Sequence, residues 1–206
     1  MISLREQTAP LNGLVMAGGM SARMQQDKAA LDYHGKPQTE VCFDLLRPHC
    51  AEVFLSVRPD QADLPGRKGL PQLHDKYTNL GPLGGILTAL DSAPDCAWLV
   101  VACDLPLLDE ATIAFLVDHR DPMCQATAFR SSGDGLPEPL CTIYEPSAFN
   151  HFLGLIDKGI SCPRKALQNS NTKLFDPPFF RALDNANTPQ EAQQLLWWLK
   201  KGKADS

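Results

Sequence analysis

The sequence lacks an apolar run long enough to cross a membrane, which argues against a membrane protein. It also lacks an excess of positive charge, because 19 Lys and Arg residues stand against 24 Asp and Glu residues and give a formal net charge of -5. We therefore expect no nucleic-acid partner and no membrane partner. Residues 1–10 are polar and include Glu6, which does not fit a secretory signal.

Several common signatures of metal binding and hydrolysis are missing. The seven cysteines form no Cys-x-x-Cys pair, the five histidines form no i,i+4 pair, and no Gly-x-Ser-x-Gly nucleophile motif occurs. Four cysteines lie inside apolar runs and are predicted to be buried, reduced thiols: Cys42, Cys96, Cys103 and Cys141. Reduced thiols are typical of the cytoplasm, so a cytoplasmic location is expected.

The chain has the composition of an ordinary globular protein. Of its 206 residues, 44% are hydrophobic and 21% are charged. This length suits one large domain or two small ones. Because no repeat, low-complexity tract or linker is visible, we predict a single domain over residues 1–206.

Hydrophobic patterning predicts alternating strands and helices. Strands are expected over 11–17, 52–57, 97–103, 124–130 and 140–144, and helices over 38–47, 82–90, 109–119, 146–156 and 188–201. Asp109 is the predicted N-cap of its helix, and Thr188-Pro189-Gln190-Glu191 is a capping box. The alternation predicts an α/β fold with a mostly parallel, doubly wound sheet.

Paired glycines follow the first predicted strand. Gly18 and Gly19 end an apolar run, and two cations, Arg23 and Lys28, come within the next ten residues. Glycines let the backbone approach a phosphate closely, and the cations offset its charge, which predicts a phosphate-binding loop. The spacing differs from that of a Walker loop and of the dinucleotide fingerprint. An ordinary strand-to-helix turn with solvated cations is the alternative.

Two carboxylates occupy positions where ligands often bind. Asp104 follows the apolar strand predicted over 97–103, and ligands of open α/β sheets bind at the carboxyl ends of strands. One carboxylate with phosphate oxygens and water is a common Mg²⁺ arrangement, although Asp104 could instead cap a turn. Asp75 precedes a glycine cluster over 81–85. These glycines would let a helix or loop pass close to a base or ribose, or they would allow a helix to pack tightly.

These motifs resemble those of the molybdenum-cofactor guanylyltransferases, within the nucleotidyltransferases of Rossmann-like, three-layer α/β/α fold. The matching segments, in the family's order, are Met16–Gly19, Ser21–Met24, Asp27-Lys28, Gly35-Lys36-Pro37, Gly81–Ile86, Cys103–Pro106, Glu138-Pro139-Leu140 and Asn185–Pro189. The Gly-Gly pair resembles the guanylyl branch of the group and differs from the cytidylyl branch. The family usually has glycine after Arg-Met, where this chain has Gln25. If that position needs a positive φ, glutamine costs about 1 kcal/mol or more.

The resemblance implies a role for each matching residue. The guanine side of GTP would be held by Met16, Ala17 and Gly18, and the phosphates by Gly19, Arg23 and Lys28. Ser56 and Asp75 would lie near the nucleotide. Asp104 would bind Mg²⁺. Catalysis would depend on Lys28, Arg23 and Asp104. Asn185 or Asn187 would assist the metal or the pterin. Residues 11–120 would form the nucleotide-binding half and 121–190 the acceptor-binding half.

The implied reaction transfers GMP from GTP to molybdopterin that carries molybdenum, with release of pyrophosphate. Proteins that deliver and accept the cofactor are expected partners. Two alternatives stay open from the residues. One is nucleotidyl transfer to a different small phosphate, including cytidylyl transfer to molybdopterin or transfer to a sugar phosphate. The other is a non-catalytic nucleotide-binding module, for which Gln25 is the one hint.

Overall fold

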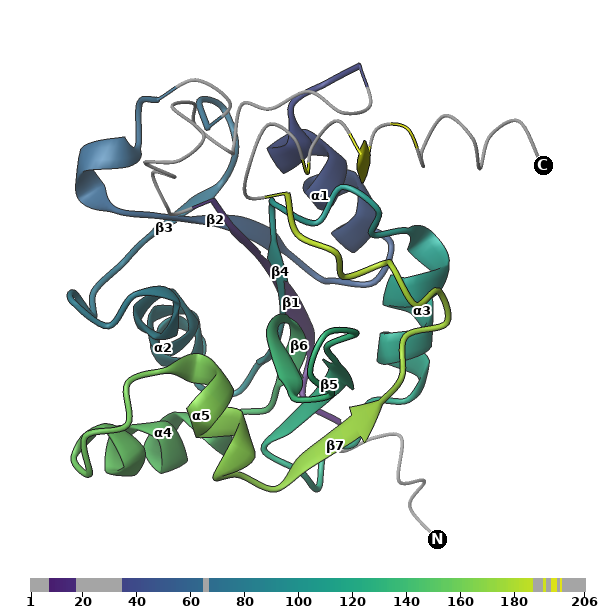
Figure 1. The fold of residues 1–206 in the computed structure, drawn as a ribbon. Helices are drawn as coiled ribbons and strands as arrows, with labels where there is room; N and C mark the ends of the chain where they lie inside the picture. Colours follow the sequence, from purple (N-terminus) through teal and green to yellow (C-terminus); the bar gives the residue numbers. More distant parts are fainter. Residues whose placement is uncertain are drawn as a thin grey trace, which may run out of the picture.

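The computed structural model describes residues 8–17, 35–64, 67–186, 191, 194, 195 and 197. Within these ranges the chain forms a seven-stranded sheet in the order β3-β2-β1-β4-β6-β5-β7 (Figure 1). The strands are β1 Leu11–Met16, β2 Val53–Val57, β3 Gln72–His74, β4 Ala97–Ala102, β5 Ala126–Arg130, β6 Pro137–Tyr144 and β7 Thr172–Phe175. Strands from both halves of the chain therefore belong to one sheet.

The two central strands, β1 and β4, are buried along their whole length. They pair in parallel with each other, and β1 also pairs in parallel with β2. Successive side chains of a strand point to opposite faces, so each central strand supplies two cores. Val15 joins the core on one face of the sheet, while Leu14 joins the core on the other.

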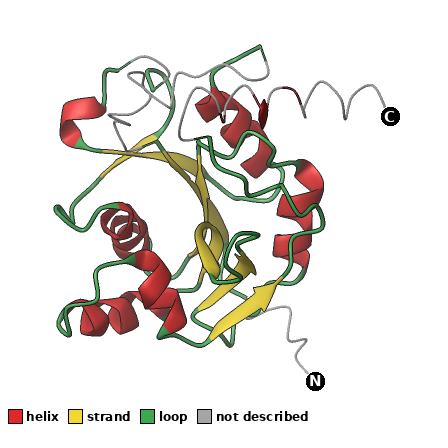
Figure 2. Cartoon of the chain, in the orientation of Figure 1, coloured by secondary structure: helices red, strands yellow, loops and turns green. Residues whose placement is uncertain are grey.

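Helices cover both faces of this sheet, as the cartoon in Figure 2 shows. Their bounds are α1 Gln38–Leu46, α2 Pro82–Ser92, α3 Glu110–Asp118, α4 Ala148–Ile156 and α5 Pro163–Gln168, with a short 3-10 helix at Pro59–Gln61. α1 and α3 pack on one face, and α2, α4 and α5 on the other (Figure 1). The predicted three-layer α/β architecture is confirmed. Within the described ranges, no helix has the length and apolar character needed to cross a bilayer.

Strand β6 runs against the direction of its neighbours. It pairs antiparallel with β4 and with β5, whereas β5 and β7 are parallel. The β5–β6 register shifts between Ala128 and Arg130, near Pro137 and Pro139 of β6. Proline has no N–H to donate to a ladder, so the irregular pairing falls where these prolines lie. Because β6 is reversed, the residues at its start lie at the same sheet edge as the residues at the end of β4.

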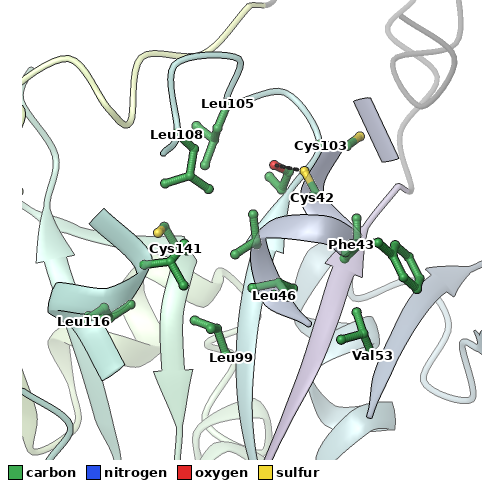
Figure 3. Packing of buried hydrophobic residues seen from close by; sticks show 14 of the residues in the cluster. Cys42, Phe43, Leu46, Val53, Leu99, Cys103, Leu105, Leu108, Leu116 and Cys141 are labelled. Atoms are coloured by element: carbon green, nitrogen blue, oxygen red, sulfur yellow. Dashed lines mark hydrogen bonds between the residues drawn. The ribbon is translucent and has the colours of Figure 1, made fainter. Parts of the chain in front are cut away.

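Three of the four predicted core thiols are buried on the α1 side of the sheet. Figure 3 shows Cys42, Cys103 and Cys141 among apolar side chains. Burial raises the pKa of Cys42 to about 12, with smaller contributions from Asp104 and Cys141, so this thiol stays protonated and unreactive. The prediction for Cys96 was wrong. This residue comes directly before β4 and not inside the strand, and its side chain is half-buried. All seven cysteines are free thiols.

Candidate functional site

The candidate site lies where the carboxyl ends of β1, β2 and β4 meet. Met16, the last residue of β1, is paired with Ser56 on one side and with Ala102 on the other. The backbone N–H of Cys103 donates to the carbonyl of Met16 at 3.2 Å, which extends the pairing to the end of both strands. The chain segments that lead to the glycine pair and to Asp104 therefore leave the sheet from adjacent positions at one edge.

Five residues of the predicted loop fall outside the described part of the chain. They are Gly18, Gly19, Arg23, Gln25 and Lys28. Their roles in holding phosphates and in catalysis, and the effect of glutamine in place of glycine, therefore stay predictions. The described residue before them is Ala17, which is buried at the end of β1.

A cavity of about 630 Å³ opens at this edge beside β1, β2 and β3. Its lining consists of strand-end residues and of the segment that precedes α2. These residues are Met16, Ser56, Arg58, Asp60, Asp75, Tyr77, Thr78, Asn79, Gly81 and Pro82. The cavity thus brings together Met16, Ser56 and Asp75, although Met16 and Asp75 are 59 positions apart in the sequence. All three were predicted to lie near a nucleotide.

Ser56 and Asp75 form a hydrogen-bonded pair in this cavity. The Ser56 hydroxyl is buried and donates to Oδ1 of Asp75 at 2.8 Å. The backbone N–H of Asp75 donates to the carbonyl of Val57, which fixes the carboxylate just beyond β3. Partial burial raises the pKa of Asp75, while the Ser56 hydroxyl and the nearby Arg58 guanidinium oppose the rise. The result is a positioned acceptor group in a space large enough for a nucleobase.

The glycines of the cluster over 81–85 allow close packing around this cavity. An added Cβ at Gly84 would lie 2.1 Å from the Tyr77 carbonyl oxygen, and one at Gly85 would lie 2.6 Å from Oγ of Ser56. Gly81 has a φ of +55°, which L side chains rarely adopt. Of the two interpretations left open for this cluster, tight helix packing is supported for Gly84 and Gly85. Their packing brings the start of α2 against the wall of the cavity.

Asp104 lies half-buried in the turn that follows β4. The N–H of Ala186 donates to the Asp104 carbonyl at 3.0 Å, so the segment after β7 returns to this edge. Asn185 is exposed and directly precedes Ala186, so this bond brings it close to the turn that holds Asp104. The Nε2 of the buried Gln38 donates to the Leu105 carbonyl at 3.4 Å, which ties the start of α1 to the same turn.

A second carboxylate, Glu138, lies near Asp104. It is buried at the start of β6, where burial raises its pKa and the negative charge of Asp104 adds to the rise. Its Oε1 accepts from the N–H of Leu140, and its Oε2 accepts from NH2 of Arg164 at 3.1 Å. Sequence reasoning noted Glu138 in a matching motif but gave it no role, because nothing in the sequence indicated that β6 is reversed.

The oxygen ligands at this edge fit a magnesium ion that takes its remaining ligands from a substrate and from water. Among the residues that the structure describes, no group of three or more His, Cys, Asp or Glu side chains could hold a metal ion. Mg²⁺ in phosphate-transferring sites is commonly held by one or two carboxylates, with substrate phosphates and water as the other ligands. Asp104 at the end of β4 matches that arrangement.

The comparison with protein families decides the assignment of the chain. Residues 13–173 match the MobA-like NTP transferase domain. This chain belongs to that family. The match begins in β1 and ends in β7, so it covers the sheet edge described above.

Curated relatives extend the match over nearly the whole chain. A molybdenum cofactor guanylyltransferase of Xanthomonas euvesicatoria pv. vesicatoria is 30% identical over 201 residues, covering 91% of this chain and 95% of that protein. A molybdenum cofactor biosynthesis bifunctional protein of Synechocystis sp. is 38% identical over 186 residues, covering 90% of this chain and 54% of that protein. The chain thus spans about half the length of the bifunctional relative.

Solved structures share the fold at low sequence identity. Molybdopterin-guanine dinucleotide biosynthesis protein A from Archaeoglobus fulgidus has a TM-score of 0.76 at 22% identity, covering 92% of this chain and 99% of that one. A nucleotidyl transferase from Methanothermobacter has a TM-score of 0.75 at 13% identity, covering 94% and 99%. These likenesses establish the architecture of the sheet and its helices.

Proposed function

We propose that this protein transfers GMP from GTP to molybdopterin that carries molybdenum, forming the guanine dinucleotide and pyrophosphate. The observation that carries the proposal is the cavity of about 630 Å³ with the Ser56–Asp75 pair, at the sheet edge from which the glycine sequence leaves β1. Support also comes from family membership and from relatives named molybdenum cofactor guanylyltransferase.

The choice of guanine follows from the chemistry of Asp75. Guanine presents two adjacent donors, N1–H and the 2-amino group, and an ionised carboxylate can accept both. Adenine, cytosine and uracil do not present this pair of donors. The hydroxyl of Ser56 holds the carboxylate at 2.8 Å, so the acceptor is already oriented before a base enters.

The chemical step needs no protein nucleophile. The terminal phosphate of the acceptor attacks the α-phosphorus of GTP in line, the bond between the α- and β-phosphates breaks, and pyrophosphate leaves with the electron pair. Lys28 and Arg23 stabilise the negative charge of the phosphates, and the backbone amides of Gly18 and Gly19 share this task. Asp104 would hold Mg²⁺, which supplies charge neutralisation to the phosphates when bound.

The acceptor would bind on the side of the edge formed by residues 121–190. Arg164, Glu138 and Asp134 are linked there by ion pairs of 2.9 and 3.1 Å, which fix the start of β6 relative to α5. Proteins that deliver and accept the cofactor are proposed partners, and the cytoplasm is the proposed location.

Two experiments test the proposal, beginning with nucleotide choice. Thermal shift with GTP, CTP, ATP and UTP, each with and without Mg²⁺, should show the largest rise in melting temperature for GTP with Mg²⁺, since a ligand that binds the folded state stabilises it. Pyrophosphate release with molybdopterin should then be Mg²⁺-dependent. Release with a sugar phosphate or with CTP instead would establish the alternative transfer reactions, and binding of GTP without release would establish a non-catalytic module.

Variants of the proposed catalytic residues complete the test. Asp104→Ala and Lys28→Ala should each lose most turnover while the protein remains folded. Asp95→Ala and Lys158→Ala are matched controls, because both residues are exposed and absent from the cavity lining, and they should keep wild-type rates. Near-normal turnover in either catalytic variant would contradict the mechanism.

A further inference from the structure

Arg58 places a positive charge in the cavity that contains the Ser56–Asp75 pair. It directly follows β2 in extended conformation and lies two positions beyond Ser56, and alternate residues of an extended chain point to the same face. Both side chains accordingly line the cavity of about 630 Å³. Burial raises the pKa of Asp75, while the Ser56 hydroxyl and the charge of Arg58 oppose the rise. A cation and a carboxylate therefore act in the same space.

A neighbouring carboxylate holds one side of the Arg58 guanidinium. Nε and Nη2 of Arg58 donate to Oδ1 and Oδ2 of Asp60, both at 3.2 Å. Asp60 lies in the 3-10 helix Pro59–Gln61, and the backbone N–H of Gln61 donates to the Arg58 carbonyl at 2.9 Å. A guanidinium is planar and carries five N–H donors, so a contact on the Nε–Nη2 side leaves the N–H groups of Nη1 for a further acceptor.

Guanine presents an acceptor directly beside the two donors that we assign to Asp75. Its O6 oxygen is bonded to the carbon next to N1, and arginine donating to O6 and N7 is the commonest specific contact that proteins make with guanine in DNA. The cavity supplies both kinds of partner, a carboxylate for the donors and a guanidinium for the acceptor. We propose that Arg58 donates from Nη1 to O6 of guanine and so selects the base together with Asp75.

This inference rests on the proposed function and adds a second side chain to the choice of base. Adenine carries an amino group where guanine has O6, and a guanidinium has no acceptor for that group. Arg58 therefore favours guanine through one atom of the base. If it served only to attract the phosphates by charge, or only to support the fold, its removal would weaken binding of every nucleoside triphosphate by the same factor.

The experiment measures Kd for GTP, 6-thio-GTP and inosine triphosphate by calorimetry with Mg²⁺, in the wild-type chain and in Arg58→Met. In 6-thio-GTP a sulfur, which is a weaker acceptor, replaces O6, whereas inosine triphosphate keeps O6 and lacks the 2-amino group. The wild type should bind 6-thio-GTP about fivefold or more weakly than GTP, because a hydrogen bond from a charged donor is weakened. In Arg58→Met this ratio should fall to about twofold or less. The ratio between inosine triphosphate and GTP should stay as in the wild type, since it reports on Asp75.

Arg47→Met is the matched control. Arg47 is also an exposed arginine paired with an aspartate, at 3.0 Å between its Nη1 and Oδ1 of Asp44, but it is the C-cap of α1 and lines a separate cavity. This variant should keep the wild-type affinities for all three ligands. Equal binding of GTP and 6-thio-GTP by the wild type, or an unchanged ratio between them in Arg58→Met, overturns the inference. Failure of the wild-type chain to bind GTP would instead overturn the proposed function.

Discussion

Replacement of Gly84 by alanine should destabilise the protein at the wall of the cavity. Gly84 is buried in the first turn of α2, and an added Cβ would lie 2.1 Å from the carbonyl oxygen of Tyr77. The obstructing atom belongs to the backbone, so no side-chain rotation can relieve the contact. The segment that contains Tyr77 would have to move away from α2, and Tyr77 itself lines the cavity.

The expected magnitude combines two opposing effects. Forcing an extra carbon into a packed site costs about 1–3 kcal/mol, and a contact of 2.1 Å with a backbone atom places Gly84→Ala at the upper end of that range. Replacing a helical glycine by alanine returns about 1 kcal/mol. The net loss in the free energy of unfolding should then be about 2 kcal/mol. For a chain of this size each kcal/mol changes the melting temperature by about 2–4 °C, so Gly84→Ala should lower it by up to about 8 °C.

Gly154→Ala provides the matched control in thermal and chemical denaturation. Gly154 is also inside a helix, α4, but an added Cβ there meets no atom within 4 Å. The same substitution should therefore raise stability by about 0.5–1 kcal/mol, because alanine has the higher helix propensity. If Gly84→Ala is as stable as the wild type, or if both variants shift in the same direction, the packing argument is refuted.

Three further predictions concern the cavity and the thiols. Burial raises the pKa of Asp75, so preference for GTP over ATP should fall as the pH drops through that raised pKa and the carboxylate gains a proton. Asp75→Asn should show a preference that is at least about tenfold weaker and independent of pH, and a wild-type preference without pH dependence would contradict the role of the ionised group. Ser56→Ala frees the carboxylate and should weaken GTP binding by less than Asp75→Asn does, measured by the same titration; an equal or larger loss would show that Ser56 does more than orient Asp75. A thiol reagent at pH 8 should label Cys162, which is exposed, well before Cys42, whose pKa burial raises to about 12. Mass spectrometry of the peptides locates the label, and labelling of Cys42 as fast as that of Cys162 would contradict this order.

The parallel part of the fold was predictable because its signals are local and strong. The apolar runs that became β1 and β4 have no polar face, as expected for strands buried on both sides. Asp109 caps α3 as predicted, and its carboxylate accepts from the N–H of Thr112 at 2.9 Å. The closing helix predicted over 188–201 lies largely outside the described residues.

Some of the remaining elements were missed, wholly or in part, for physical reasons. β7 is an edge strand whose four residues are all half-buried, so it shows neither a continuous apolar run nor a clean alternation. α5 has only six residues, too few for a helical period to emerge. The strand predicted from residue 140 begins at Pro137 in the structure. Its first residues were not recognised because the prolines among them are atypical of a strand.

The site was predictable in its strand ends and less so in its surroundings. Met16, Ser56 and Asp75 came from motifs and do line one cavity. Glu138 and Arg58 were not assigned a role, since their positions depend on a reversed strand and on the start of a connection rich in proline and glycine. Long-range geometry of this kind leaves no periodic trace in a sequence.

The reversal of β6 has a consequence for how this architecture can diversify. A hairpin joins β5 to β6, and its tip at 131–136 rises from the same edge as Asp104. Lengthening or rewriting that tip would change one wall of the proposed acceptor side without disturbing the ladder between β1, β2 and β4. Descendants of one ancestral nucleotide binder could thus adopt new acceptors by editing a single connection.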